Sequence, residues 1–311
     1  MTEFIMLVGI PGSGKSHIAK MFKGYDVFSS DKIREELTGD ASNQEFNKKV
    51  FEILHKNIFD SLKNRRSSIY DATNLSSKRR RRFIETISKL DVHKVALVVA
   101  TPFEECVENN QNRERVVPDY VMDRMYKSFQ IPIEQEGFDT VQICYNNRQG
   151  IENYDLATLM KKAIVFDQKN KHHSHTLGEH MDAVGDYVFS KPHCFCGLYL
   201  ASAIHDIGKL KTQVFKDGDA SAHYYNHENV GAYDAMFVTK LINDNAFGQH
   251  DKKFVPYYLS KIVVDVCKYI NWHMYPYSIK SEKTKEKFID FVGKDFYDAI
   301  MLLHEADLAS H

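Results

Sequence analysis

An eight-residue segment near the N-terminus, GIPGSGKS, has the composition and spacing of a phosphate-binding loop. It follows an apolar, strand-like run and opens a helical pattern, so backbone N–H groups at a helix N-terminus would face the phosphates. Lys15 would reach the β- and γ-phosphates of ATP or another nucleoside triphosphate and act in catalysis, and Ser16 would bind Mg²⁺. The residues predicted to bind this cofactor are Gly9, Gly12, Ser13, Gly14, Lys15 and Ser16.

Charged residues after the next predicted strand could bind an acceptor. In Ser30-Asp31-Lys32-Ile33-Arg34, Asp31 and Arg34 stand about one helical turn apart. Asp31 could accept a proton from an attacking hydroxyl, and Arg34 could hold a substrate phosphate with two hydrogen bonds. Taken alone, the pair would more readily be explained as a helix N-cap with an i,i+3 salt bridge.

Two further segments carry polar residues that suit the same site. YDATNL ends a predicted strand, at the edge of an α/β sheet where ligands bind, so Asp71, Thr73 and Asn74 are candidate substrate-binding residues. Arg113 and Arg115 stand in a polar segment, where they could close over the ATP phosphates and neutralise charge in the transition state. The alternative for each arginine is an ordinary surface residue.

The C-terminal half contains histidines and aspartates on helical patterns that are otherwise apolar. Such groups are costly to bury without partners, and the interior of a helical bundle can gather them around metal. Any one histidine alone would be an ordinary core or surface residue. Imidazole and carboxylate ligands together suit Mn, Fe, Co, Ni or Zn, and the sequence does not choose among them. The candidates are His180, His205, Asp206, His227, His273 and Asp307.

Alternating strand-like and helical patterns predict the scaffold for the first set of residues. They indicate an α/β unit over residues 1–150, with a mostly parallel sheet and helices on both faces. The polar stretch 146–150 is the predicted linker. The predicted strands are 3–10, 25–29, 67–71, 92–100 and 140–145, and the clearest helices are 13–22, 43–64, 76–90 and 118–129.

From residue 175 onward helical patterns dominate, which predicts an all-α domain over residues 151–311. One stretch in this half, AIVFD at 163–167, looks like the strand before an aspartyl-phosphate phosphatase motif. Its continuation, Gln168-Lys169-Asn170, lacks the second aspartate and the glycine, so that chemistry is rejected. The predicted helices are 177–190, 196–206, 227–243, 255–271, 284–292 and 294–309.

Bulk composition is that of a globular protein with room for two domains. The chain has 311 residues, 43% of them hydrophobic and 27% charged, and no apolar run approaches the ~20 residues of a membrane-spanning helix. Five cysteines in no even framework favour reduced thiols in a cytoplasm. Cys194 and Cys196 form a CxC pair, for which ordinary thiols are favoured over a zinc site.

The net charge of −1 implies no global attraction to nucleic acid. Residues 78–82, KRRRR, are a local exception. They are either a solvated helix face or a surface that contacts phosphates.

Residues 3–130 resemble the kinase domain of the phage polynucleotide kinase–phosphatase family. The matching segments are GIPGSGKS, SSDKIREEL, YDATNL and NNQNRERVVPDYVMDRMYKSF. The resemblance implies that Asp31 is the general base for a 5′-hydroxyl, Arg34 binds the neighbouring phosphate, and Arg113 is the lid arginine. Where the family has an aspartate before Thr-Asn, this sequence has Ala72, with Asp71 one place earlier. The choice between Arg113 and Arg115 stays open.

Residues 165–311 resemble the HD phosphohydrolase superfamily, which would replace the phosphatase domain usual in the phage family. The resemblance implies that His180, His205, Asp206 and Asp307 bind one metal and that His227 and His273 bind a second, bridged by Asp206. Two metals would activate a hydroxide. Lys209 is implied to neutralise the substrate phosphate and counts, with Asp206, as catalytic.

Together the two resemblances predict a bifunctional enzyme that heals broken polynucleotide ends, most simply in RNA repair. The kinase would phosphorylate 5′-OH ends, and the HD domain would remove 3′-phosphate or 2′,3′-cyclic phosphate. RNA or DNA ends are the expected partners, with an RNA ligase as a further candidate, in the cytoplasm (of the host if a phage encodes the protein). Two alternatives are a nucleoside or metabolite kinase fused to an HD nucleotidase, and a non-catalytic ATP-binding module that gates an HD sensor.

Overall fold

The computed structural model describes residues 1–148, 150–169, 175–192, 196–247, 254 and 256–310. The chain divides into two compact units. Unit 1 comprises Met1–Met125, Pro132–Gln149 and Asp251–Ser260, and unit 2 comprises Tyr126–Ile131, Gly150–His250 and Lys261–His311. No helix among the described residues is long and apolar enough to cross a membrane.

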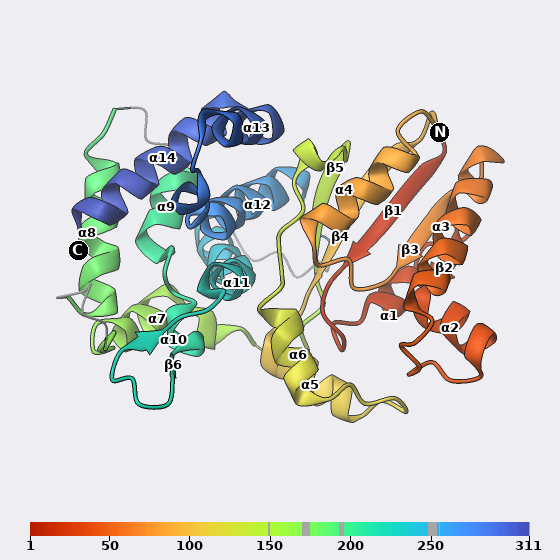
Figure 1. Ribbon diagram of the computed structural model, residues 1–311, viewed down its shortest axis with the longest axis horizontal. Helices are drawn as coiled ribbons and strands as arrows, with labels where there is room; N and C mark the ends of the chain where they lie inside the picture. Colours follow the sequence, from red (N-terminus) through yellow and green to blue (C-terminus); the bar gives the residue numbers. More distant parts are fainter. Residues whose placement is uncertain (149, 170–174, 193–195, 248–253, 255, 311) are drawn as a thin grey trace. The chain divides into compact units, whose positions relative to one another are not determined.

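Unit 1 is built on a five-stranded sheet with the strand order β2-β3-β1-β4-β5 (Figure 1). All four strand pairs are parallel, which confirms the predicted parallel sheet. The central strands β1 and β4 are nearly continuous runs of apolar residues because both of their faces are buried. The strands are β1 (Glu3–Val8), β2 (Asp26–Ser29), β3 (Ser68–Asp71), β4 (His93–Ala100) and β5 (Thr140–Tyr145).

Helices connect these strands, as parallel pairing requires. No bounds were predicted for two of them, α2 and α5, and the predicted helix at 76–90 ends at Thr86. The helices of the connections are α1 (Lys15–Ala19), α2 (Ser30–Thr38), α3 (Asn47–Lys63), α4 (Ser77–Thr86), α5 (Phe103–Gln111) and α6 (Asp119–Tyr126), with a 3₁₀ turn at Glu134–Glu136.

Among its described residues, unit 2 is helical apart from a two-stranded hairpin, which agrees with the helical pattern of this half of the sequence. Its helix α8 begins with a capping box between Thr176 and Glu179. The helices are α7 (Leu156–Ala163), α8 (Leu177–Phe189), α9 (Cys196–Ile204), α10 (Lys209–Thr212), α11 (His227–Phe247), α12 (Tyr257–Trp272, of which residues 257–260 belong to unit 1), α13 (Glu282–Val292) and α14 (Lys294–Ala309). The hairpin is β6 (Val214–Phe215) with β7 (Ala222–His223), and 3₁₀ turns lie at Glu152–Tyr154 and Tyr275–Ser278.

Residues 126–131, the last residue of α6 and the five that follow it, pack within unit 2. The Asn271 side chain accepts a hydrogen bond from the Ile131 backbone N–H at 2.8 Å and donates one to the Phe129 carbonyl at 3.2 Å. The Tyr126 hydroxyl donates to Asp234 at 2.5 Å. These contacts hold residues 126–131 within unit 2, although in the chain they precede residue 150, the predicted domain boundary.

The basic run 78–82 is not a uniformly solvated face, because Arg80 is only 1% exposed. Its guanidinium donates two hydrogen bonds of 2.7 Å to the buried carboxylate of Glu136 and further bonds to the carbonyls of Asn74 and Leu75 at 2.9 and 3.0 Å. Both interpretations of the run must therefore exclude Arg80, which holds α4 and the loop before it in place.

We expect Arg80→Ala to lower the free energy of unfolding by about 3–5 kcal/mol, because it leaves the Glu136 carboxylate buried without its counter-charge. The exposed neighbour Arg79 is the control, and Arg79→Ala should change stability by less than about 0.5 kcal/mol. Urea unfolding followed by far-UV circular dichroism measures both. Equal effects of the two substitutions would show that the Arg80–Glu136 pair does not support the fold.

Candidate active sites

The phosphate-binding loop of unit 1 has the backbone conformation that its glycines allow. Gly12 and Gly14 have φ angles of +81° and +88°, in the left-handed region. A β-carbon on Gly12 would lie 2.1 Å from the carbonyl oxygen of Cys106, so no larger residue fits there. Lys15 begins α1, is buried, and donates a hydrogen bond to the Ile10 carbonyl at 2.8 Å. Its ammonium thus lies inside the loop, and burial lowers its pKa.

Ser16 and Asp71 form a second part of this site. The Ser16 hydroxyl donates to Asp71 Oδ2 at 2.8 Å, and the carboxylate is buried at the end of β3, beside the phosphate-loop strand β1. Because Ser16 is the predicted Mg²⁺ ligand, Asp71 stands where a carboxylate would support the metal. The sequence suggests a substrate contact for Asp71, and the structure brings its carboxylate to the Ser16 hydroxyl of the phosphate loop.

The other residues of YDATNL fasten the loop to β1. The Gly9 backbone N–H donates to the Thr73 carbonyl at 3.0 Å. The Asn74 side chain donates to the Leu7 carbonyl at 2.8 Å, and its own φ of +47° makes the turn that allows this. The amide of Asn74 is therefore engaged by the protein itself, and the backbone of Thr73 supports the phosphate loop.

The predicted acceptor and lid residues meet around one carboxylate. Asp31 Oδ1 lies 2.8 Å from Arg34 Nη1 and 3.0 Å from Arg115 Nη1, and Asp31 Oδ2 lies 3.9 Å from Arg113 Nη2. Asp31, Asp71 and Arg113 are all close enough to perturb the pKa of Lys15. Residues from α1, α2, β3 and the segment after α5 thus converge on a single site.

Arg34 is the most firmly fixed of the three arginines. Its side chain is 5% exposed, against 28% for Arg115 and 39% for Arg113. Its Nη2 donates to Asn47 Oδ1 at 2.9 Å, whereas its buried Nε has no hydrogen-bond partner. A guanidinium held this way, with an unused donor, is suited to bind an anionic group. The sequence did not single out Asn47, which lies 13 residues away and positions it.

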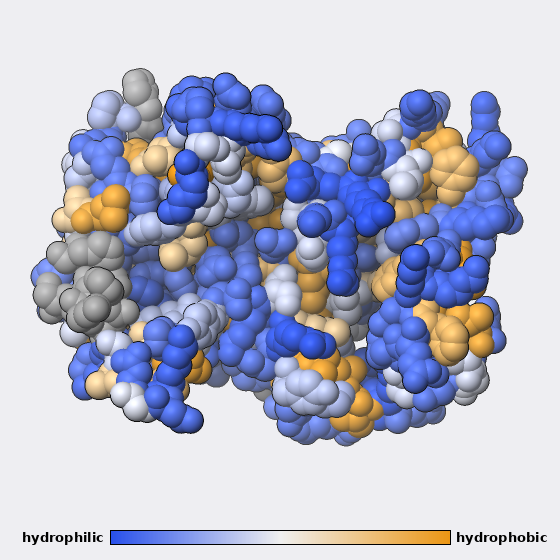
Figure 2. All heavy atoms as spheres, in the orientation of Figure 1, coloured by the Kyte–Doolittle hydropathy of each residue, from blue (hydrophilic) through white to orange (hydrophobic). Residues whose placement is uncertain are grey.

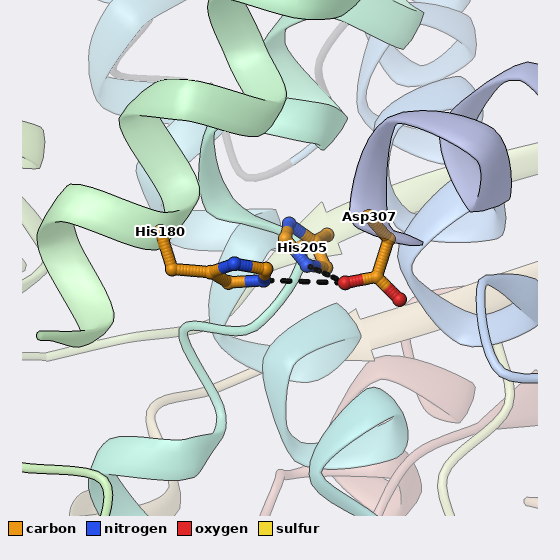
Figure 3. A group of neighbouring side chains, drawn as sticks. All are labelled: His180, His205 and Asp307. Atoms are coloured by element: carbon orange, nitrogen blue, oxygen red, sulfur yellow. Dashed lines mark ion pairs between the residues drawn. The ribbon is translucent and has the colours of Figure 1, made fainter. Parts of the chain in front are cut away.

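Unit 2 brings together the six predicted metal ligands in two groups of three. Figure 3 shows the first group, His180 on α8, His205 just after α9, and Asp307 on α14. Both imidazoles point at the carboxylate of Asp307, with His180 Nε2 3.2 Å and His205 Nε2 3.7 Å from Oδ1. Both histidines are fully buried.

The second group is Asp206 with His227, the first residue of α11, and His273, which follows α12. Asp206 Oδ1 lies 3.0 Å from His227 Nε2 and 3.6 Å from His273 Nε2. The other oxygen, Oδ2, lies 3.6 and 3.5 Å from the Nε2 atoms of His180 and His205. Asp206 therefore directs one oxygen to each group, as a bridging ligand would.

Each of the four imidazoles has its Nδ1 atom next to a backbone carbonyl and its Nε2 atom turned toward the cluster. The acceptors are the carbonyls of Ser310, Ser202, Tyr224 and Ile270, at 3.1, 2.8, 2.7 and 2.7 Å from His180, His205, His227 and His273 respectively. A carbonyl only accepts, so each Nδ1 carries the proton of that hydrogen bond, and each ring turns its Nε2 atom inward. Outer hydrogen bonds of this kind are what orient metal-bound histidines.

Two contacts within the cluster suit a bound cation. His227 Nε2 and His273 Nε2 lie 3.1 Å apart, where two lone pairs would repel each other. His205 Nε2 is buried and has no hydrogen-bond partner. Burial alone would raise the pKa of Asp206. Lys209 and the histidines around the carboxylate nevertheless hold this pKa well below its ordinary value. The donor set fits one or two divalent ions.

Lys209 is buried within this cluster and is already engaged. Its Nζ lies 2.6 Å from Asp206 Oδ2 and donates to Gln168 Oε1 at 3.0 Å. Sequence reasoning missed Gln168, which belongs to the rejected phosphatase-like stretch, and Tyr277, whose hydroxyl donates to Asp307 Oδ2 at 3.0 Å. No motif marks either residue. Of the CxC pair, Cys194 and the side chain of Cys196 lie outside the described residues.

Comparisons with known proteins found a matching family, a curated relative and several similar structures. Residues 4–132 match the model of a family described as an AAA domain. A curated relative, the L-seryl-tRNA(Sec) kinase of Methanococcus maripaludis, is 27% identical over 161 residues, which are 49% of this chain and 62% of the relative. The chain thus spans less than two thirds of the length of that relative.

Three solved structures are similar over part of the chain. Two are named as a Pnkp1/Rnl/Hen1 complex and a Pnkp1/Rnl/Hen1 RNA repair complex. The first is 27% identical, covers 38% of this chain and 40% of its own, and has a TM-score of 0.33. The second is 24% identical, covers 44% and 46%, and has a TM-score of 0.39. A gluconokinase from Sinorhizobium meliloti 1021 is 16% identical, covers 49% and 86%, and has a TM-score of 0.34.

The phosphate loop on a parallel sheet and the family match over residues 4–132 lead to the same conclusion. The N-terminal part of the chain is a P-loop kinase domain of the α/β class, for which ATP with Mg²⁺ is the cofactor, and a helical region follows it.

Proposed function

We propose that the protein heals broken RNA ends, with a polynucleotide 5′-hydroxyl kinase over about residues 1–150 and an HD-type metal phosphohydrolase over about residues 151–311. The observation that carries the kinase half is the placement of Asp31 beside the buried, preorganised Arg34. A guanidinium next to the general base favours an acceptor hydroxyl with a phosphate close by, which is what a polynucleotide end provides.

Each residue of the kinase site has a role in this proposal. Lys15 neutralises the β- and γ-phosphates, and Ser16 with Asp71 holds Mg²⁺. Asp31 accepts the proton of the 5′-hydroxyl as it attacks the γ-phosphorus. In the structure Arg113 and Arg115 face Asp31. Bound ATP would draw these arginines toward its phosphates, which frees the carboxylate and stabilises the transferring group.

The hydrolase half rests on the inward-facing Nε2 atoms of four histidines around Asp206. When bound there, divalent ions would supply an activated water and stabilise the leaving oxygen. His180, His205 and Asp307 would hold one ion, and His227 and His273 the other. Lys209 fixes the Asp206 carboxylate and contributes positive charge for the phosphate of the substrate. The products, a 5′-phosphate and a 3′-hydroxyl, suit an RNA ligase as partner.

The kinase proposal is tested by the choice of acceptor. Given ATP, Mg²⁺ and equal concentrations of 5′-OH RNA, 5′-OH DNA, unacylated and seryl-tRNA, nucleosides and gluconate, we expect RNA 5′ ends to be phosphorylated fastest. Preferred transfer to nucleosides or gluconate would favour the small-molecule alternative, and preferred transfer to seryl-tRNA would favour the activity named for the curated relative.

Asp31→Asn should lower the rate of phosphorylation by about 10²–10⁴-fold with little change in ATP affinity, because it removes the proton acceptor but no phosphate contact. Glu35→Gln, on the exposed side of the same helix, removes the same charge and is the control. Single-turnover kinetics with labelled ATP measures both. Equal rates for Asp31→Asn and Glu35→Gln would remove Asp31 from the mechanism.

A further inference from the structure

One face of α4 presents basic side chains that the fold does not explain. Lys78, Arg79, Arg81 and Arg82 are exposed, while Arg80 between them is buried. Figure 2 shows strongly hydrophilic side chains gathered over this helix. Within the part of the chain that the structure describes, Lys78, Arg79 and Arg82 form no ion pair.

These charges oppose the stability of the helix that carries them. Lys78 and Arg79 lie in the first turn of α4, which contains no acidic residue, so they face the positive end of the helix dipole. Arg82 is four residues from Lys78 and three from Arg79, which places like charges side by side. Arg80 holds α4 in place through its hydrogen bonds to Glu136 and to the preceding loop. The exposed basic residues thus destabilise the helix, and Arg80 holds it in place. Charges of this kind indicate a role other than folding.

The position of α4 connects this face to the kinase site. The loop before the helix lies against the phosphate-binding loop, through the bonds from Gly9 to Thr73 and from Asn74 to Leu7. Only Leu75 and Ser76 separate Asn74 from the start of α4. The basic residues occupy the first two turns of the helix, where they are nearest to that edge of the sheet.

We propose that Lys78, Arg79 and Arg82 bind the phosphate backbone of a single-stranded polynucleotide beyond its 5′-terminal nucleotide. This inference rests on the proposed kinase function, which it deepens by assigning a surface to the strand. Unpaired cations on one helix face complement a row of phosphates, and such contacts are independent of sequence and weaken with salt. Arg34 would then hold the phosphate next to the reacting hydroxyl, and α4 the phosphates further along.

The test compares the full chain with the triple variant Lys78→Ala/Arg79→Ala/Arg82→Ala. The control is Lys56→Ala/Lys63→Ala/Lys89→Ala, which removes the same charge from exposed positions of unit 1. Fluorescence anisotropy with a single-stranded RNA of about 20 nucleotides gives the affinity at several salt concentrations. The slope of log affinity against log salt should fall by about 2 in the α4 variant, since each lost contact to a single strand removes about 0.7. Between about 50 and 200 mM salt, the wild type should therefore lose about twentyfold more affinity than the α4 variant.

Two further readouts separate binding from folding and from catalysis. The thermal midpoint of the α4 variant should stay or rise, because the removed charges destabilise the helix. Phosphorylation of a nucleoside 3′-monophosphate should be unchanged, whereas the KM for the 20-nucleotide strand should rise. Unchanged affinity and salt slope in the α4 variant, or equal losses in the control, would overturn the inference. If no RNA is phosphorylated at all but the α4 variant still loses binding, the surface stands and the kinase proposal fails.

Discussion

Asp206→Asn is expected to abolish metal-dependent release of phosphate from RNA 3′ ends, while 5′ phosphorylation continues at the wild-type rate. Asp206 is the residue that both groups of candidate ligands share, with one oxygen directed to each. An amide keeps the shape but cannot provide two anionic oxygens to two cations. A loss of at least about 10³-fold in hydrolysis follows if charge stabilisation by the site dominates the rate.

Metal binding should disappear with the same substitution. An ion that binds only the folded protein stabilises it by about 2.7 kcal/mol at a concentration of 100 times its dissociation constant. Added Mn²⁺ should thus raise the thermal midpoint of the wild type and of the control Asp290→Asn, an exposed position on α13, but not that of Asp206→Asn. A midpoint for Asp206→Asn that still rises with metal would contradict the assigned ligands.

Asp206→Asn also leaves the ammonium of the buried Lys209 without a counter-charge, which lowers the stability of the fold. The double variant Asp206→Asn/Lys209→Met removes both charges and keeps a similar volume. It should recover stability but neither metal binding nor hydrolysis. Recovery of hydrolysis in the folded double variant would show that neither residue serves the reaction.

Lys15→Ala is expected to give the complementary result, a loss of at least about 10³-fold in 5′ phosphorylation with unchanged hydrolysis at the 3′ end. The ammonium of Lys15 lies within the phosphate-binding loop, and its pKa is perturbed by Asp31, Asp71 and Arg113 of the same site. Lys20→Ala, at the exposed end of α1, is the control for charge. A Lys15→Ala protein that phosphorylates RNA within tenfold of the wild-type rate would remove this lysine from the transition state.

Local patterns in the sequence were enough to predict the parallel sheet and the phosphate loop. A strand, a glycine-rich turn and a helix follow one another without a gap, so each residue of that motif is positioned by its neighbours. The ligand candidates of unit 2 were marked by a different local signal, polar residues on otherwise apolar helices. Both patterns can be recognised in the sequence without knowledge of the tertiary structure.

Contacts between distant segments could not be predicted in the same way. The bond between Ser16 and Asp71 depends on the parallel register of β1 with β3, in which Met6 pairs with Tyr70. Arg80 looks like its neighbours in the basic run, and its ion pair with Glu136, 56 residues later, could not be predicted from that run. Gln168 is likewise defined by a partner, Lys209, that lies 41 residues away.

The most direct test of a two-site RNA end-healing enzyme is an end-group assay on one RNA that begins with a 5′-hydroxyl and ends with a 3′-phosphate. With ATP, Mg²⁺ and Mn²⁺, the wild type should convert both ends, Lys15→Ala only the 3′ end, and Asp206→Asn only the 5′ end. An RNA whose ends both stay unchanged with the wild type, or a single variant that loses both activities while it remains folded, would contradict the account.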